Sequence, residues 1–169
     1  MALIVENGTG KSDAESYISV ADADTYVTNY RGATHAWLSL DNTTKEVLLR
    51  RAALYLDTHY LNRWKGHATT SSQRLQWPRI DAVTASGWYL DYDSIPEVLG
   101  YAQVEAAIRF NEDSDNVQPD LTRGGKVKSE KVDVIAITYM DGAPARTVYT
   151  QVEEWLKDLI IESGRMVRS

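Results

Sequence analysis

Apolar residues recur at helical spacing in residues 40–61, the strongest helical signal of the chain. One stripe of this helix consists of Leu49, Ala53, Leu56 and Tyr60. A second stripe, well round the cylinder from the first, consists of Val47, Leu54 and Leu61. A surface helix needs only one apolar stripe, so we expect this helix to pack on two sides.

Another helix is predicted from Asp93-Ser94, as cap, and Pro96, in the first turn, to about Asn111. Its first apolar stripe consists of Ile95, Leu99, Ala102, Ala106 and Phe110. The opposite stripe consists of Tyr101, Val104 and Ile108. Glu105 and Arg109 are spaced to pair across one turn. A chain of this size has few helices to cover both sides, so we predict that Tyr101, Val104 and Ile108 pack against a neighbouring subunit.

Two further helices flank these. Ser19, with Asp22 three residues later, predicts a helix running to Tyr30 and ended by Gly32. Near the C-terminus, a helix is expected from about Thr147 to Glu162, with Glu153 spaced to pair with Lys157. Its apolar face consists of Val148, Val152, Trp155 and Leu159.

The remaining segments lack helical periodicity. Residues 126–139 alternate with period two and are rich in β-branched side chains, which predicts one long strand or a hairpin turning near Val132-Asp133. Residues 62–94 contain Trp64, Trp77 and Trp88 among turn residues. A connection this long with its own aromatics is expected to be an ordered arm, anchored by its tryptophans.

The pattern as a whole predicts a mainly α fold: a small helical bundle with a β-strand or hairpin and a long ordered arm. We expect residues 1–169 to form a single domain. Its expected parts are a helical core at about 19–61 and 95–111, the arm 62–94, the β element 126–139, and the C-terminal helix and tail 147–169.

Composition is that of an ordinary globular protein, with 43% hydrophobic and 25% charged residues. The absence of cysteine excludes disulfides, thiol catalysis and sulfur-ligated metals. No apolar run approaches a membrane span. The net charge of −6 opposes tight, sequence-independent binding to nucleic acid. Five Trp and ten Tyr against one Phe slightly favour a protein that binds other proteins.

The segment Gly8-Thr9-Gly10-Lys11-Ser12 imitates the end of a phosphate-binding loop. A Walker A loop needs a glycine five residues before Gly10, where this chain has Val5. Asp13 and Glu15 would also place carboxylates where phosphate must lie. We therefore interpret the segment as a glycine-turned surface loop.

No catalytic, cofactor or metal site emerges from the motifs. His35, His59 and His67 have no ligand spacing, and the calcium-loop-like stretch from Asp113 lacks the turn glycine and the final glutamate. Carboxylates are plentiful, but nothing selects a pair for hydrolysis. We expect no cofactor, no metal and no enzymatic activity.

Two basic clusters are candidates for binding nucleic acid. The first comprises Arg123, Lys126, Lys128 and Lys131, and the second Arg63 and Lys65 around Trp64. Basic residues interleaved with aromatics can track a single strand. Glu130, however, shares a strand face with Lys126 and Lys128. Charged residues that keep an exposed strand from aggregating are the better interpretation.

The order of the segments resembles the head–tail connector (adaptor) proteins of long-tailed bacteriophages over most of the chain. The resemblance is carried by Met1 to Gly10, Ala14 to Asp24, Leu48-Leu49-Arg50-Arg51-Ala52, Tyr55-Leu56-Asp57, Arg63-Trp64-Lys65-Gly66, Gln76-Trp77-Pro78-Arg79, Ile95-Pro96 and Val127 to Val132. Chains of this kind also resemble a DnaT-like, primosomal single-stranded-DNA-binding protein. The acidic balance makes that the second interpretation.

The connector resemblance implies a structural protein of the virion neck, made in the host cytoplasm. It implies a homo-oligomeric ring, commonly of twelve subunits, between the portal and the next neck or tail protein, with DNA passing through without sequence-specific contacts. We hypothesise that the C-terminal helix and tail dock on the portal through Trp155, Leu159, Arg165, Met166, Val167 and Arg168. We further hypothesise that ring or tail contacts are made by Lys126, Lys128, Lys131, Ile135 and Ile137.

Overall fold

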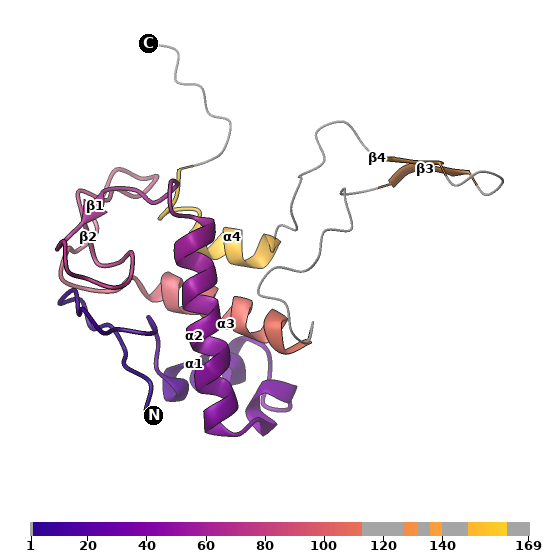
Figure 1. Cartoon of the computed structure of the whole chain (residues 1–169), viewed down its shortest axis with the longest axis horizontal. Helices are drawn as coiled ribbons and strands as arrows, with labels where there is room; N and C mark the ends of the chain where they lie inside the picture. The colour runs from indigo at the N-terminus through magenta and orange to yellow at the C-terminus, as the bar shows by residue number, and fades with distance from the viewer. Residues whose placement is uncertain (1, 113–126, 132–135, 140–148, 162–169) are drawn as a thin grey trace, which may run out of the picture.

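The computed structural model describes residues 2–112, 127–131, 136–139 and 149–161, and these confirm the expected mainly α fold with a small β component (Figure 1). Its elements are α1 Val20–Tyr30, the 3-10 helix η1 Ala36–Ser39, α2 Asn42–His59, β1 His67–Ala68, β2 Arg79–Ile80, α3 Glu97–Glu112, β3 Val127–Lys131, β4 Ala136–Tyr139 and α4 Thr150–Leu156.

The first two helices begin where the sequence predicts, because each has a side-chain cap. The Ser19 hydroxyl accepts the backbone N–H of Asp22 at 3.1 Å, and the Asp41 carboxylate accepts that of Thr44 at 3.0 Å. At the end of α1, Gly32 takes a φ of +99° and its N–H bonds the Val27 carbonyl at 2.9 Å. This left-handed glycine stops the helix as expected.

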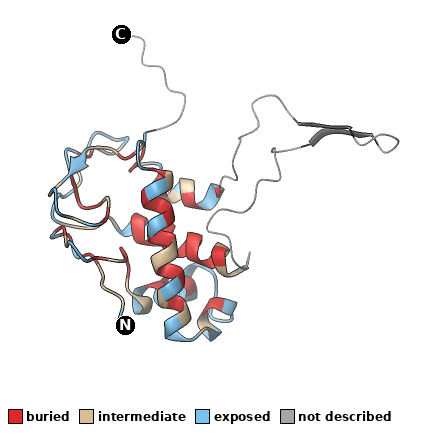
Figure 2. Ribbon diagram, in the orientation of Figure 1, coloured by how far each residue is buried: buried red, intermediate tan, exposed pale blue. Residues whose placement is uncertain are grey.

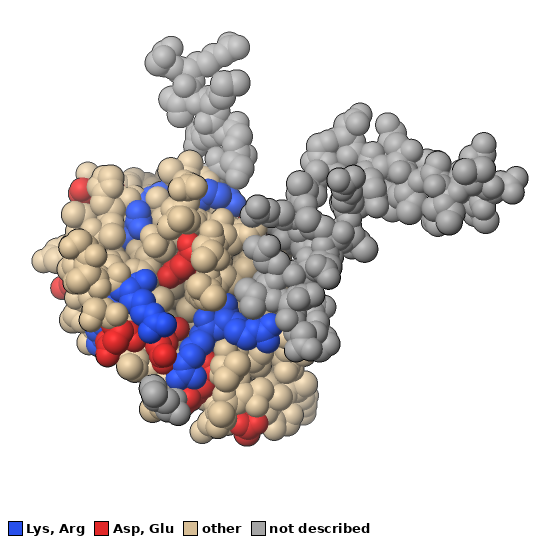
Figure 3. Space-filling view, in the orientation of Figure 1, with Lys and Arg blue, Asp and Glu red and all other residues tan. Residues whose placement is uncertain are grey.

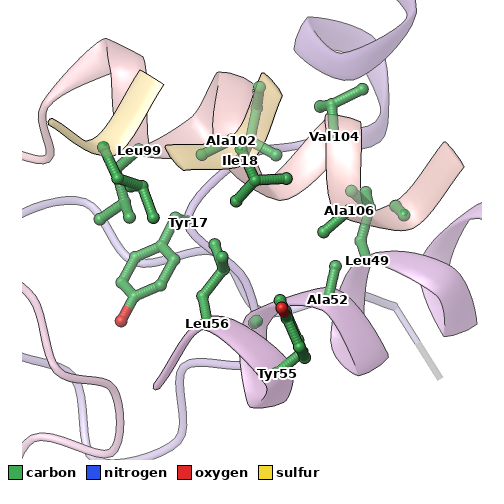
Figure 4. Packing of buried hydrophobic residues seen from close by; sticks show 14 of the residues in the cluster. Tyr17, Ile18, Leu49, Ala52, Tyr55, Leu56, Leu99, Ala102, Val104 and Ala106 are labelled. Carbon is green, nitrogen blue, oxygen red and sulfur yellow. The ribbon is translucent and has the colours of Figure 1, made fainter. Parts of the chain in front are cut away.

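Helix α3 lies at the centre of the bundle and packs against α1, α2 and α4. Figure 4 shows Leu99 and Ala106 of α3 in the cluster that they form with Leu49 and Leu56 of α2. Both predicted stripes of α3 are therefore covered within one chain. The expectation that its second stripe needs a neighbouring subunit is wrong for Val104, which has no exposed surface, and for Ile108, at 5%.

Helix α2 is buried on one side only (Figure 2). Its predicted first stripe is fully inside, and Leu48, Ala52 and Tyr55 are buried beside it. The second stripe is not covered by the described part of the chain: Val47, Leu54 and Leu61 are 47%, 58% and 52% exposed. The prediction that α2 packs on two sides is thus unmet within these residues.

The arm 62–94 is ordered, and two of its tryptophans hold it to the bundle. Trp64 and Trp77 are buried, and the short strands β1 and β2, each of which follows one of these tryptophans, pair antiparallel with His67 opposite Ile80. Gly66, at φ +67°, allows this pairing, since a Cβ there would lie 2.2 Å from the Ile80 carbonyl oxygen. Trp88 is 75% exposed, so the prediction that all three tryptophans anchor the arm is wrong for this one.

Strands β3 and β4 pair antiparallel, so this region forms a hairpin and not one long strand. Lys131 lies opposite Ala136 and Val127 opposite Tyr139. The register shifts between Val127 and Ser129, an irregularity that strict alternation does not predict. The expected turn at Val132-Asp133 lies outside the described residues.

Helix α4 is shorter than expected because the chain after it turns to pair with the arm. The N–H of Ile161 bonds the Arg63 carbonyl at 2.7 Å, and the N–H of Lys65 bonds the Leu159 carbonyl at 3.0 Å. These bonds, with the bridge between Trp64 and Ile160, end the helix before residue 162. The beginning predicted at Thr147 lies outside the described residues.

Candidate nucleic-acid and protein interfaces

The glycine-rich segment near the N-terminus closes around its own carboxylate. Glu6 is only 3% exposed and accepts the backbone N–H groups of Gly8 at 3.0 Å, Gly10 at 3.0 Å and Lys11 at 2.8 Å. The backbone N–H of Asn7 also donates to Glu6, at 3.1 Å. Successive N–H groups that converge in this way form an anion-binding concavity. Because Glu6 already fills it, a phosphate could enter only by expelling that side chain.

A groove of about 450 Å³ runs between α2 and the arm and is lined by three arginines, Arg50, Arg51 and Arg74. Its apolar wall consists of Ala53, Leu54, Leu61 and Leu75, and its carboxylates are Glu15 and Asp57. Figure 3 shows Lys and Arg gathered on the face over α2, with carboxylates beside them. The groove therefore gathers three arginines, with carboxylates beside them, on an acidic chain.

Two of these arginines are held by ion pairs. Arg50 Nε lies 2.9 Å from Glu15 Oε2, and Arg50 Nη1 lies 3.4 Å from Glu46 Oε2. Arg74 Nη1 reaches Glu15 at 4.0 Å, and the Arg74 side chain is 56% exposed. Hydrogen bonding to the Arg50 guanidinium lowers the pKa of Glu15, so this carboxylate is ionised at neutral pH.

The third arginine is positioned by an aromatic ring. The Arg51 guanidinium carbon lies 5.8 Å from the centre of the Phe110 ring, and that of Arg109 lies 6.0 Å from the centre of the Tyr149 ring. The Phe110 and Tyr149 rings are themselves 6.3 Å apart. We call Arg50, Arg51, Arg74 and Arg109 the arginine face. It draws on α2, the arm and α3.

Beneath the groove, a buried network ties the arm to the bundle. The Tyr17 hydroxyl donates a short hydrogen bond to Asp57 Oδ1, and the Gln76 N–H is 3.0 Å from the Tyr17 hydroxyl oxygen and 3.1 Å from Asp57 Oδ2. Burial raises the pKa of Asp57 to about 6. Burial and the nearby carboxylate also raise the pKa of Tyr17, so its phenol stays protonated. This network fixes the wall of the groove formed by the arm.

The arm also carries a small exposed loop. Val83 and Tyr89 form an antiparallel bridge, the Thr84 N–H bonds the Trp88 carbonyl at 2.9 Å, and the Gly87 N–H bonds the Thr84 carbonyl at 3.0 Å. Beyond this turn, Trp88, Tyr89 and Tyr92 are 75%, 74% and 60% exposed. We call these three residues the aromatic tip. Exposed aromatics held on a bonded turn are typical of a binding element.

A second aromatic cluster joins α1, α3 and α4 through Tyr26, Tyr30, Tyr101 and Trp155. The Tyr26 and Tyr101 ring centres are 4.7 Å apart, and those of Tyr101 and Trp155 are 5.3 Å apart. Beneath them the Tyr26 hydroxyl donates to the buried Glu105 at 2.6 Å, and Trp155 Nε1 donates to Tyr26 at 3.1 Å. Tyr101 and Trp155, two predicted contact residues, are therefore half-buried members of one intramolecular cluster.

Two predicted ion pairs are wrong. Glu105 bonds Arg31, the residue that follows α1, through Nε at 2.9 Å and a shorter contact to Nη2, rather than Arg109. Glu153 bonds Arg63 at 3.0 Å, while Lys157 faces Glu154 at 3.5 Å. In both cases packing of a separate segment onto the helix brings a guanidinium closer than the neighbour one turn away.

The residues predicted to dock on the portal do not all lie at the surface. Leu159 is 1% exposed and belongs to the core, so it is not available to a partner, and this part of the hypothesis is wrong. The reason is the turn after α4, which folds Leu159 against the arm. Arg165, Met166, Val167 and Arg168 lie outside the described residues.

The predicted ring or tail contacts fall on the hairpin. Lys128 and Lys131 lie on β3 and Ile137 on β4, opposite Glu130. Lys126 and Ile135 lie outside the described residues. The second basic cluster does not expose its aromatic, since Trp64 is 5% exposed and Arg63 is paired with Glu153. Trp64 is therefore not a surface on which a base could stack.

Within the described residues no three His, Asp or Glu side chains gather as they would around a metal ion. His59 stacks on Tyr55 with ring centres 5.0 Å apart, and His35 Nδ1 accepts the Trp37 N–H at 3.2 Å. In the same part of the chain, none of the helices has the length and apolar character needed to cross a membrane.

In the sequence, Arg50 and Arg51 stand out only within the connector resemblance, and Arg74 does not stand out at all. The available signal was two adjacent arginines on the side of α2 that also carries Leu54. The nearness of Arg74 depends on the path of the arm and has no local signal. The roles of Glu6 and Tyr17 were likewise not predicted.

The described part of the chain thus presents an arginine-lined groove and an exposed aromatic loop on a helical domain. A family model described as "Putative DnaT-like ssDNA binding protein" matches residues 1–169. The chain belongs to this family. No curated protein and no solved structure matches it.

Proposed function

We propose that this protein binds single-stranded DNA on the arginine face. The observation that carries the proposal is the convergence of Arg50, Arg51 and Arg74 on one groove of a chain whose net charge is −6. The name of the family points to the same ligand. Guanidinium groups are the preferred donors to phosphate oxygens, because their planar fork can bond two oxygens at once.

We expect each arginine to play a different role in binding the phosphates. Arg51, held over Phe110, offers a fixed donor at the centre of the face. Arg74, more than half exposed, is 4.0 Å from Glu15 and can turn toward a ligand with little loss. Glu15 competes with phosphate for Arg50 and Arg74. The affinity should therefore be modest and fall as salt is added.

A filter-binding titration with an oligothymidine at several salt concentrations tests this proposal. Neutralising about three phosphates of a single strand gives a slope of roughly −2 in log K against log salt. Arg51→Glu with Arg74→Glu should remove most binding and flatten the slope. Lys157→Glu is the control, because this side chain is 66% exposed and lies outside the groove. Equal affinity of the double variant and the wild type would reject the arginine face.

A second candidate is the structural role in the phage neck, as a non-enzymatic protein of the virion. The aromatic tip and the uncovered Val47, Leu54 and Leu61 favour it, because these apolar surfaces suit contact with protein better than with phosphate. On this proposal copies form a ring, commonly of twelve subunits, that binds the portal and the next neck protein and lets double-stranded DNA pass. The sequence resemblance supports the same role.

The two candidates predict different results in phage particles. If the protein is a neck component, a labelled copy should appear at the head–tail junction by electron microscopy. Deleting Gly164 to Ser169 should abolish neck assembly while leaving the fold intact, and a proline at Ile135 should block ring closure. A protein absent from finished particles, with salt-dependent binding to oligonucleotides, would support the first candidate alone.

A further inference from the structure

Two surfaces of this chain are complementary to each other, and the described part of the chain leaves both uncovered. We propose that the aromatic tip of one copy inserts into the arginine-lined groove of a second copy. This contact goes beyond the proposed binding of DNA and does not depend on it. The kind of partner follows from the chemistry of the two surfaces.

The aromatic tip projects from a hydrogen-bonded turn and is suited to entering a recess. Trp88 and Tyr89 project from a turn closed by the Val83–Tyr89 bridge, and the N–H of Ala85 bonds Asp158 Oδ1 at 3.3 Å. The backbone of the tip is therefore held before any contact, so little conformational entropy is lost on docking. Tryptophan and tyrosine are also the residues that contribute most to protein interfaces.

The groove offers an apolar wall that the described residues leave partly exposed. Leu54 is 58% exposed and Leu61 is 52% exposed, on the edge of a recess of about 450 Å³. That volume lies within the range of roughly 300–1,000 Å³ of pockets that take a flat ring system. An indole placed here would cover both leucines and lie beside Arg51.

Charge makes the fit specific. Asp91 and Asp93 are exposed on either side of Tyr92. Arginines outnumber carboxylates among the residues that line the groove. An aromatic ring against a guanidinium adds a cation–π contact, and the aspartates would meet Arg50 or Arg74. A contact between the aromatic tips of two copies would instead bring like charges together. The aromatic tip, which is acidic, should therefore prefer the groove.

The contact is heterologous, since it joins two different surfaces, and repeating it closes a ring or extends a filament. A strand of DNA bound on the arginine face would occupy the same groove. The tip of a second copy and single-stranded DNA should therefore exclude each other.

The test compares Trp88→Ala, which removes the tip, with Leu54→Asp, which alters the groove. We expect the wild type to gain mass with concentration in sedimentation velocity and each variant to stay monomeric. An equimolar mixture of the two variants should form dimers, because the intact tip of Leu54→Asp fits the intact groove of Trp88→Ala. Only a heterologous contact gives this complementation.

Two controls match these variants. Thr43→Asp places the same charge on an exposed site of α2 outside the groove, and Tyr30→Ala removes an exposed aromatic of α1. Both should assemble like the wild type, and circular dichroism should show all four variants folded. A wild type that stays monomeric up to about 1 mM would overturn the proposal, whatever its affinity for DNA. So would a mixture of the two variants that remains monomeric.

Discussion

The hydroxyl of Tyr17 and the carboxylate of Asp57, which lie 40 residues apart in the sequence, share one buried hydrogen bond. The backbone N–H of Gln76 bonds both groups, and that of Trp77 bonds the Tyr17 hydroxyl at 3.3 Å. The N-terminal segment, α2 and the arm therefore meet at a single polar point. Removing any one of these hydrogen-bonding groups should destabilise all three segments.

Tyr17→Phe should lower the free energy of unfolding by about 1–3 kcal/mol. The substitution keeps the ring but leaves the Trp77 N–H without its acceptor, and Asp57 loses the hydroxyl donor while it keeps the Gln76 N–H. Urea denaturation monitored by circular dichroism measures the change. Tyr30→Phe is the matched control, because its hydroxyl belongs to a residue that is 57% exposed, and it should change stability by less than about 0.5 kcal/mol.

Stability should fall as the pH rises through the range in which Asp57 ionises. The folded state raises the pKa of Asp57 from 3.8 to about 6, so the folded protein binds this proton more tightly than the unfolded chain. Its contribution is complete below about pH 4 and is lost as the pH passes about 6, amounting to about 3 kcal/mol. Calorimetry of the wild type and of Asp57→Asn across this range measures it. If both proteins show the same pH dependence, Asp57 is not the group responsible.

Glu6→Ala should destabilise the N-terminal loop, because it removes the acceptor of four backbone N–H groups. We expect a loss of at least about 2 kcal/mol, since hydrogen bonds to a charged group are the stronger kind. Hydrogen exchange at Gly8, Gly10 and Lys11 should quicken, while Glu154→Ala, an exposed carboxylate, should leave it unchanged. Unchanged protection in Glu6→Ala would show that the loop does not need this carboxylate.

Arg31→Met should cost about 3 kcal/mol of folding free energy, the lower end of the range for breaking a buried ion pair, because Arg31 is one-third exposed. Among the described residues, Glu105, which is 1% exposed, would keep only the Tyr26 hydroxyl as a hydrogen-bond partner. Adding Glu105→Gln removes the unpaired charge and should restore part of the loss. A thermal melt of the three proteins is sufficient. A double variant less stable than Arg31→Met would contradict this account.

The helices could be predicted from the sequence because their signals are local. Ser19, Asp41 and Gly32 mark ends by caps and turns that involve only neighbouring residues. Burial could not be assigned as well, since periodicity identifies an apolar face without showing what covers it. Both stripes of α3 are covered by α1, α2 and α4, whereas Leu54 on α2 is not.

The candidate sites were largely beyond the reach of sequence reasoning. Arg51 and Arg74 are 23 positions apart, and the arm brings them together through contacts such as the Gln76–Asp57 hydrogen bond. Nothing in the spacing of these residues shows that proximity. The role of Glu6 has no sequence signal, because a glycine-rich loop does not by itself show which side chain its N–H groups will bind.

The uneven burial of the tryptophans also gives the molecule a built-in optical reporter. Trp37, Trp64 and Trp77 are enclosed and Trp155 is partly covered, so Trp88 is the indole most open to water among the five. Iodide or acrylamide in solution should quench its emission first, without any attached dye. Binding of a protein or a nucleic acid that shields this loop should shift the emission spectrum of the unmodified chain to the blue.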